Sequence, residues 1–337
     1  MKKKLFYLFL FIIIVKFIII GTFIICLLTN NCKHIEIQNE DFTIEKPLWS
    51  KGPLKSSYSN MDTEKISNTK YLICYMKKCK EILWIRNGSH TKNTNSDLDK
   101  IANNLHFLTE PIILITSDGD RPVPSSYKDI TVKRLLESPK IIKWFTQNYD
   151  VSVKHQKLNH IPIGFDLHTT KWQVGNSSYD KLTFMVSHNS DPKVLKILCD
   201  AHLSLYNGSE RVVMLKEIEN NTNIDLVASR LPFVDIIKLY ASYEFVLSPA
   251  GAGLDCHRTW EAILAGCIVI TRKSPLDEMF IKNKLPVVIL DDWSDLKDNL
   301  QEKLKKWYIE YKPLTNINLI IPKLSFGYWL KSKNEIK

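Results

Sequence analysis

Residues 243–271, YEFVLSPAGAGLDCHRTWEAILAGCIVIT, decide the fold. The stretch opens with a short apolar run that ends at Pro249, which is typical of a buried strand. A turn of small residues follows, and Asp255 is placed to cap a helix that we expect to run to Ala265. Gly266 stands where a glycine commonly ends a helix, and a second β-rich run comes next. The order strand, glycine turn, helix and strand predicts a βαβ crossover.

The turn and the helix after it carry groups that suit a nucleotide. Gly251 and Gly253 leave backbone N–H groups open at a helix start, where the positive end of the dipole favours a phosphate. Arg258 follows on the first turn, where its planar guanidinium can bond a diphosphate, and His257 is a second donor. Glu261, one turn further on, suits a pair of ribose hydroxyls. The alternative is a generic βαβ unit in which Arg258 and Glu261 form a solvated i,i+3 pair.

Residues 248–270, SPAGAGLDCHRTWEAILAGCIVI, resemble the C-terminal nucleotide-sugar motif of exostosin-like glycosyltransferases. The shared features are a serine-proline-glycine turn, an arginine before a Glu-Ala helix, and a Gly-Cys-Ile strand start. The resemblance implies a nucleotide diphosphate sugar as donor, inversion of configuration and no essential metal cofactor. Ser248 and the glycine turn would then hold the donor, Arg258 would stabilise the departing diphosphate, and Glu261 would bind the ribose.

Composition indicates a globular protein with acidic small-molecule or glycan ligands. The chain has 337 residues, 45% of them hydrophobic, which is enough for two domains. Its formal net charge is +10, but aromatic residues are not interleaved with basic clusters, so we do not expect nucleic acid as a partner. An acidic nucleotide or an anionic glycan fits better, and a merely basic background is the alternative.

The first 68 residues predict a membrane anchor and a stem. Residues 5–28 are almost wholly apolar and would span about 36 Å as a helix, with Lys16 the one charge. The lysines before this run predict that residues 1–4 are cytoplasmic, so the protein would be a single-pass type II protein of the Golgi or endoplasmic reticulum membrane with a lumenal catalytic region. A cleaved signal peptide is the alternative. Residues 29–68 are polar and read as a stem.

A lumenal location is consistent with the cysteines and with four glycosylation sequons. Six cysteines follow the anchor, and Cys74 and Cys79 are close enough in sequence to pair locally. No Cys/His cluster has the spacing of a structural zinc site. The sequons are at Asn87, Asn176, Asn207 and Asn220.

The remaining chain alternates strand-like and helix-like segments, which predicts parallel sheets with sites at their carboxyl edges. We expect strands at 71–75, 82–85, 111–116, 182–186, 212–215, 245–247, 267–271 and 286–290, and helices at 97–108, 138–148, 192–206, 232–242, 255–265 and 293–307. The predicted fold is α/β, with two doubly wound Rossmann-like domains facing a cleft. These are an acceptor-side domain at 69–168 and a nucleotide-sugar-binding domain with a C-terminal tail at 169–337. The family resemblance implies the same two-domain architecture, called GT-B.

Two further clusters are candidates for chemistry. Asp118 and Asp120 follow a predicted strand, and either carboxylate could face the cleft and deprotonate an acceptor hydroxyl. The alternatives for this D-x-D are a metal site or a simple loop turn. His188 and Asn189 follow the expected strand at 182–186 and could face the diphosphate or the acceptor, or be solvated. Arg211, at the end of another expected strand, could also meet a phosphate.

The leading interpretation is thus a glycosyltransferase that uses a nucleotide diphosphate sugar and a glycan or glycoprotein acceptor. The alternative is a non-catalytic glycan-binding or scaffold protein on the same fold, because Ala250 stands where the family often has a basic residue. A dinucleotide oxidoreductase is disfavoured, because the pattern G-x-G-x-x-G is not met: Cys256 follows where the third glycine is required.

Overall fold

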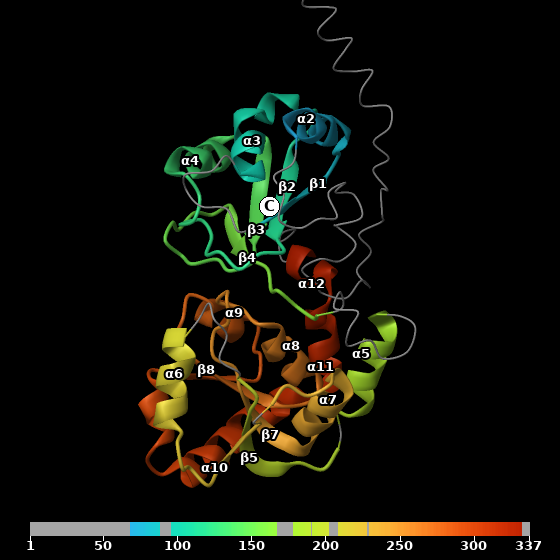
Figure 1. Ribbon diagram of the computed structural model, residues 1–337. Helices are drawn as coiled ribbons and strands as arrows, with labels where there is room; N and C mark the ends of the chain where they lie inside the picture. Colours follow the sequence, from blue (N-terminus) through green and yellow to red (C-terminus); the bar gives the residue numbers. More distant parts are fainter. Residues whose placement is uncertain are drawn as a thin grey trace, which may run out of the picture.

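The computed structural model describes residues 68–87, 96–166, 178–189, 191–201, 208–227 and 229–331. Two parallel β-sheets, each with its own helices, lie one above the other (Figure 1). The expected anchor at 5–28 and the stem lie outside these ranges, as does the expected domain boundary at 168. Within them, no helix has the length and apolar character needed to cross a membrane.

The N-terminal sheet has four parallel strands in the order β1-β2-β3-β4. They are β1 (Ile82–Arg86), β2 (Ile112–Ser117), β3 (Ile141–Thr146) and β4 (Leu158–His160). Its helices are α2 (Thr69–Lys78), α3 (Asp97–Asn103), the 3-10 helix η2 (Leu105–Phe107) and α4 (Asp129–Glu137). The helices α2, α3 and α4 gather at the end away from the second sheet (Figure 1). The described strands follow one another without the reversal of order that a doubly wound sheet requires, so that part of the prediction is wrong for this sheet.

The C-terminal sheet has five parallel strands in the order β6-β5-β7-β8-β9. They are β5 (Val194–Cys199), β6 (Ile224–Leu226), β7 (Tyr243–Leu247), β8 (Ile268–Arg272) and β9 (Val287–Leu290). The strand order reverses between β5 and β7, so this sheet is doubly wound, as predicted. Such a reversal leaves a crevice at the carboxyl ends of the two strands, where ligands bind in open α/β sheets.

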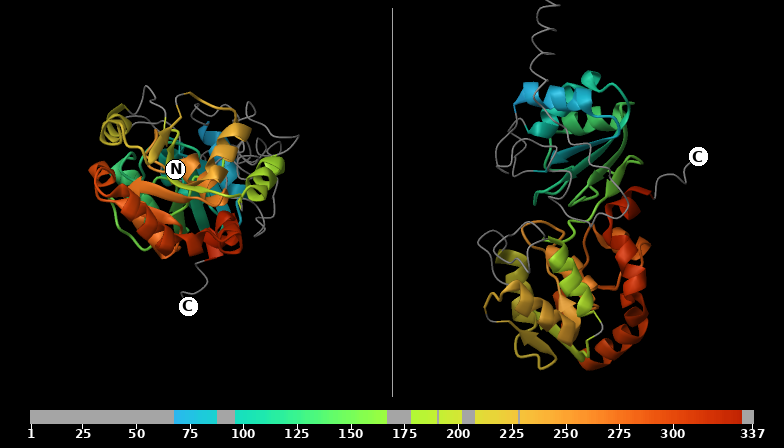
Figure 2. Two further views of the ribbon diagram at one scale, coloured as in Figure 1. Left: turned by 90° about the horizontal axis from the view of Figure 1, so that it is seen from below. Right: turned by 90° about the vertical axis from the view of Figure 1, so that its right-hand side faces the viewer.

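Helices cover both faces of this second sheet (Figure 2). The helices of this part of the chain are α5 (Ser178–Ser187), α6 (Gly208–Glu217), α7 (Phe233–Ser242), α8 (His257–Leu264), α9 (Asp277–Lys282), α10 (Leu300–Tyr311), α11 (Ile317–Ile320) and α12 (Phe326–Lys331). Three 3-10 helices complete the unit: η4 (Trp293–Leu296), η5 (Lys312–Thr315) and η6 (Ile321–Leu324).

The continuous apolar runs of β7 and β8 arise because both faces of the sheet are buried. Val246 and Val269 join a core cluster with Ile263 of α8. Phe245 points to the opposite face, into a second cluster with Leu304 of α10. Alternate residues of one strand therefore fill two cores, which explains why the run shows no alternation of apolar and polar residues.

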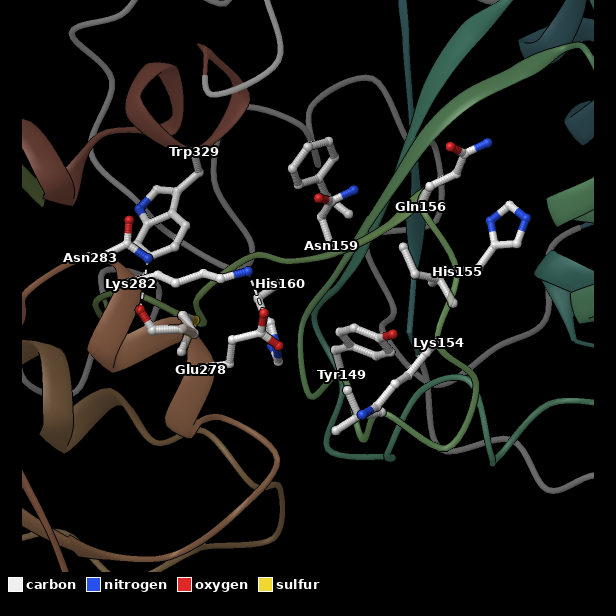
Figure 3. Close-up of a pocket in the computed structure, with 14 residues that line it drawn as sticks. Tyr149, Lys154, His155, Gln156, Asn159, His160, Glu278, Lys282, Asn283 and Trp329 are labelled. Carbon is white, nitrogen blue, oxygen red and sulfur yellow. Dashed lines mark hydrogen bonds and ion pairs between the residues drawn. The ribbon is translucent and has the colours of Figure 1, made fainter. Parts of the chain in front are cut away.

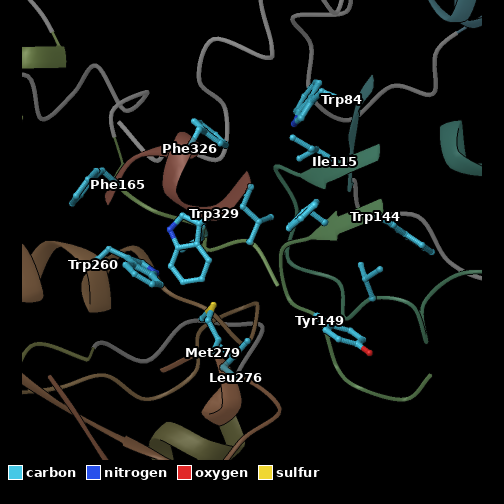
Figure 4. Close-up of a cluster of buried hydrophobic side chains, with 14 of the residues drawn as sticks. Trp84, Ile115, Trp144, Tyr149, Phe165, Trp260, Leu276, Met279, Phe326 and Trp329 are labelled. Atoms are coloured by element: carbon cyan, nitrogen blue, oxygen red, sulfur yellow. The ribbon is translucent and has the colours of Figure 1, made fainter. Parts of the chain in front are cut away.

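One core cluster extends across both sheets through helix α12, which packs back between the two units. The ring of Trp329 on α12 lies 6.1 Å from that of Trp260 on α8, at 89° (Figure 4). Trp329 also lines a cavity with Phe145 of β3. The chain end thus contributes apolar contacts that join the two units.

Five of the expected elements have the wrong type. The segments 71–75, 182–186 and 212–215 were expected as strands and lie in α2, α5 and α6, whereas 138–148 and 192–206 were expected as helices and contain β3 and β5. Apolar runs of four or five residues fit either structure. In α2 the buried residues Leu72, Tyr75 and Met76 recur at helical spacing, so the helix buries one face. In β3 the β-branched and aromatic residues prevail over the helix-start signal of Ser138 and Pro139.

The cysteine pairing also differs from the expectation. Cys74 is disulfide-bonded, and its partner lies outside the residues that the structure describes. Cys79 is a free, buried thiol, so the local Cys74–Cys79 pair was wrong. Both residues belong to α2 and its end, where a helix holds positions five apart on different faces.

Candidate functional site

The candidate site lies at the switch point between β5 and β7. Leu198 of β5 pairs with Val246 of β7, so the loops after the two strands begin side by side. Asp200 follows β5, and the loop that starts at Ser248 leads from β7 into α8. Helix α8 starts at His257, with Cys256 rather than the expected Asp255 at its N-cap.

Close packing leaves little room for a side chain at the two glycines of the loop, and least at Gly253. A Cβ at Gly251 would lie 3.0 Å from Sγ of Cys256 and 3.2 Å from Nη2 of Arg211. A Cβ at Gly253 would lie 2.7 Å from the side-chain nitrogen of Asn148, which comes from the N-terminal unit. The loop therefore brings its backbone close to a guanidinium and to the opposite unit, and any larger residue would separate them.

Ser248 is buried, and its hydroxyl bonds that of Thr259 on α8 over 2.8 Å. The structure therefore assigns it to fixing the helix against the strand end. The main-chain N–H of Gly251 donates to the carbonyl of Gly253 over 3.0 Å, which closes the turn.

Arg258 forms an ion pair with Asp200, and only 13% of its side chain is exposed. Asp200 also accepts a hydrogen bond of 2.7 Å from the hydroxyl of Tyr240. Burial acts to lower the pKa of Arg258, but its ionisable neighbours, Asp200 first among them, together outweigh burial and raise that pKa. Arg258 is thus held in the crevice by Asp200, rather than in the solvated pair with Glu261 that was the alternative prediction.

Arg211 brings a second guanidinium to the loop, from helix α6 rather than from a strand end. Its Nε donates to the carbonyl of Ala250 over 3.1 Å. Burial and the neighbouring Arg258 lower the pKa of Arg211. Two cations therefore lie beside the turn; Asp200 pairs with Arg258, and Asp120 and Glu210 bring two further carboxylates to the cavity at the turn.

Glu261 and His257 face the segment that links the two units. The main-chain N–H of Asp166 donates to Oε1 of Glu261 over 3.4 Å. Burial, with a smaller contribution from Asp166, raises the pKa of Glu261 to about 7. Nδ1 of His257 lies 2.7 Å from the carbonyl oxygen of Gly164, so Nδ1 carries the proton and donates.

His188 and Asn189 lie at the far end of α8 from the glycine turn. Nδ2 of Asn189 donates to the carbonyl of Leu264 over 2.9 Å, which caps the last turn of the helix. Nδ1 of His188 lies 2.8 Å from the carbonyl of Phe184 at the end of α5. The expectation that both residues lie beside the start of the Arg258 helix was wrong, because the segment before them is a helix and not a strand.

Of the two predicted bases, Asp120 faces the glycine turn. It lines a cavity of about 210 Å³ together with Glu210 and residues 250–254. Asp118 is buried, with a φ of 61°, and its N–H donates to Oε1 of Gln147 over 3.1 Å. Asp118 thus stabilises the loop after β2, and the same loop places Asp120 opposite the glycine turn of the other unit.

No metal site accompanies these groups in the part of the chain that the structure describes: no three His, Cys, Asp or Glu side chains cluster there in a way that could hold an ion.

The fold and the site define an α/β protein with parallel sheets and a cationic crevice at a switch point. No protein-family model matches the chain. No curated protein matches it either.

Three solved structures are similar to the chain at low identity. AviGT4, described as a glycosyltransferase involved in avilamycin A biosynthesis, has 10% identity and a TM-score of 0.32, over 76% of this chain and 96% of that one. WaaG, described as a glycosyltransferase involved in lipopolysaccharide biosynthesis, has 10% identity and a TM-score of 0.32, over 76% and 98%. The GtfA/B complex has 10% identity and a TM-score of 0.34, over 70% and 59%. At these TM-scores the likeness carries no argument about this chain's activity.

Proposed function

We propose that this protein is a GT-B glycosyltransferase of the exostosin-like kind, which moves a sugar from a nucleotide diphosphate sugar to a glycan or glycoprotein acceptor with inversion and no essential metal. One observation carries the proposal. A glycine turn, two guanidinium groups and the start of α8 converge at the switch point of a doubly wound sheet, and a carboxylate of the opposite unit faces them.

Each group has a role in the proposed transfer. Arg211 and the glycine turn bind the diphosphate, and Arg258 in the crevice adds positive electrostatic potential at the same place. Glu261 binds the ribose. The acceptor oxygen attacks the anomeric carbon of the donor sugar, and the bond between that carbon and the nucleotide diphosphate breaks. Asp120 takes the proton of the acceptor hydroxyl.

The proposed setting is the lumenal face of the Golgi or endoplasmic reticulum membrane. The disulfide of Cys74 supports it, because such bonds persist in oxidising compartments. Asn220 is exposed in its sequon, whereas Asn87 is buried and its amide bonds Arg121 and Tyr127, so Asn220 is the better glycosylation acceptor. The sequons at 176 and 207 lie outside the described ranges.

The proposal is tested by titrating the purified full-length protein with UDP and GDP while its melting temperature is recorded, and by screening sugar nucleotides for nucleotide release. We expect Arg211→Ala to weaken nucleotide binding about tenfold to a hundredfold. Lys216→Ala, an exposed change on the same helix, is the matched control. Unchanged melting with every nucleotide, or equal affinity in Arg211→Ala and the control, would reject the donor site.

A non-catalytic binding protein remains the second candidate, because Asp200 already neutralises Arg258. Asp120→Asn separates the two. If the protein is an enzyme, the turnover number falls about a hundredfold while the melting shift with nucleotide persists. A protein that binds nucleotide and releases none from any donor would be the scaffold.

A further inference from the structure

A second and larger cavity lies between the two units, with a volume of about 800 Å³. Its walls are β4 and the loop before it on one side, and α9 with Trp329 of α12 on the other (Figure 3). Ligand cavities in proteins span about 300–1,000 Å³, so this one is large enough for several sugar rings.

The larger cavity and the glycine turn have no lining residue in common, and Asn148 contacts the turn from the N-terminal unit. Asn148, next to Tyr149 of the cavity wall, donates from Nδ2 to the carbonyl of Gly119 over 2.9 Å. Its Oδ1 accepts from the N–H of Asp255 over 2.9 Å. Both cavities therefore lie at the boundary between the units, and Asn148 is close to each of them in the chain or in space.

The accessible walls of the larger cavity are polar and nearly balanced in charge. Lys154 and Gln156 are exposed on one side, and Glu278 and Lys282 on the other (Figure 3). Lys282 and Glu278 already form an ion pair, so the cavity does not require a charged ligand. Its wall offers both donors and acceptors.

Each of the two opposite walls carries an aromatic ring, Tyr149 in the N-terminal unit and Trp329 in the C-terminal unit (Figure 3), and the polar atom of each ring already donates a hydrogen bond. The hydroxyl of Tyr149 donates to the carbonyl of Val153 over 2.7 Å. Nε1 of Trp329 donates to the carbonyl of Lys323 over 2.7 Å. Both side chains are largely buried, with 5% of Tyr149 and 6% of Trp329 exposed, and the small apolar surface that each keeps open to the cavity can pack against the C–H groups of a sugar.

His160 is the group in this cavity that lacks a partner. Both of its ring nitrogens are buried, and neither has a hydrogen-bond partner among the described residues. Burial lowers the pKa of His160 to about 4, so the ring is neutral and offers one donor and one acceptor. A buried polar group without a partner costs about 1–3 kcal/mol, which a ligand hydroxyl would recover after the ring turns about its Cβ–Cγ bond.

We propose that this cavity binds a saccharide segment of the acceptor, with its sugar rings between the walls that carry Tyr149 and Trp329 and a hydroxyl bonded to His160. The inference rests on the proposed function and narrows the acceptor to a glycan. Hydroxyl-rich rings satisfy the mixed donors and acceptors of the wall, and the unpartnered nitrogens of His160 offer a hydroxyl one further donor and acceptor.

The test follows tryptophan fluorescence and saturation-transfer NMR of the full-length protein with cellotetraose, chitotetraose and a hyaluronan tetrasaccharide. We expect at least one of these probes to bind. His160→Phe keeps the ring that lies 4.8 Å from Tyr149 and should weaken that binding about tenfold. Glu278→Gln, on the exposed face of the opposite unit, should weaken it about threefold without affecting folding.

The outcomes separate this inference from the proposed function. Saccharide binding that depends on His160 and that UDP does not displace supports the inference. The inference is overturned if none of the three probes binds, or if UDP competes with the saccharide. It is also overturned if His160→Phe and Glu278→Gln bind the saccharide as tightly as the parent protein. The melting shift with nucleotide is read in the same samples, so loss of that shift alone rejects the donor site and leaves the saccharide result standing.

Discussion

Oδ2 of Asp255 accepts the main-chain N–H of Ile163 over 2.7 Å, and this bond joins the start of α8 to the segment that leads out of the N-terminal sheet. The other oxygen, Oδ1, accepts from Nε1 of Trp260 over 2.9 Å. Asp255 is buried, and burial raises its pKa to about 6. The residue that resembles a helix cap in the sequence is thus a tie between the two units.

Asp255→Asn should lower the free energy of unfolding by about 1–3 kcal/mol, because an amide presents a donor where the carboxylate accepted from both Ile163 and Trp260. Urea unfolding followed by tryptophan fluorescence measures the change. Asp298→Asn, on the exposed surface, is the control and should leave unfolding unchanged. Equal midpoints for the two variants would show that the tie does not contribute to stability.

The stability contribution of Glu261 should depend on pH. Its folded-state pKa of about 7 exceeds its ordinary value of 4.5, so the folded protein binds the proton more tightly. Stability from this group is complete below pH 4.5 and is lost as the pH rises through 7. As the pH rises from 5 to 8, the free energy of unfolding of Glu261→Gln should therefore increase by about 1–2 kcal/mol relative to that of the parent protein.

Urea unfolding of both proteins at pH 5 and pH 8 checks this. Glu302→Gln, exposed on α10, is the control and should follow the parent at both values. Asp255 is present in all three proteins, so its own titration cancels in the comparison. If the free energies of unfolding of Glu261→Gln and the parent differ by the same amount at both pH values, the raised pKa of Glu261 is contradicted.

The pair of Asp200 and Arg258 predicts opposite effects on nucleotide affinity. Asp200→Asn removes a negative charge from beside the proposed diphosphate, while Tyr240 keeps its bond, so UDP should bind about five- to thirtyfold tighter. Adding Arg258→Met to Asp200→Asn should reverse that gain. Calorimetric titration with UDP measures the affinity of Asp200→Asn and of the double variant. Equal affinity in the two would show that Arg258 takes no part in binding. Each single change at this pair leaves the other charge buried without its partner, so melting without nucleotide checks that each variant folds.

The βαβ unit around the glycine turn could be predicted because several independent signals coincide there. Two apolar runs frame it, and Gly266 takes the expected left-handed conformation with a φ of 80°. The placement of Asp120 at the carboxyl edge of the N-terminal sheet follows from the rule that parallel strands present their carboxyl ends at one edge. The exact start of α8 could not be predicted, because the tertiary bonds of Asp255 replace the cap.

The partners of the site residues were beyond sequence reasoning. Asp200 stands 58 positions before Arg258 and follows a strand whose short apolar run also fits a helix. Asn148, which meets Gly253 and Asp255, lies more than a hundred residues before them and in the other unit. Such contacts depend on how the two sheets meet, and no local pattern encodes that arrangement.

Asn189→Ala should destabilise the protein without affecting nucleotide binding, because Asn189 caps the carboxyl end of α8. Loss of its bond to Leu264 should cost about 1 kcal/mol in the free energy of unfolding. Thermal melting with and without UDP measures both quantities. A weaker UDP shift in Asn189→Ala would restore the ligand role that the sequence suggested.

Gly253→Ala should force the two units apart at the proposed donor site. The added methyl would lie 2.7 Å from the side-chain nitrogen of Asn148. Hydrogen bonds to Gly119 and Asp255 hold this side chain in place. We expect a loss of about 1–3 kcal/mol in the free energy of unfolding. Ala252→Ser, one residue away and exposed, is the matched control. Asn148→Gly suits the φ of 55° at that position and removes the clashing amide, so the double variant should lose less than the sum of the single losses. Strictly additive losses would show that Gly253 and Asn148 do not meet in solution.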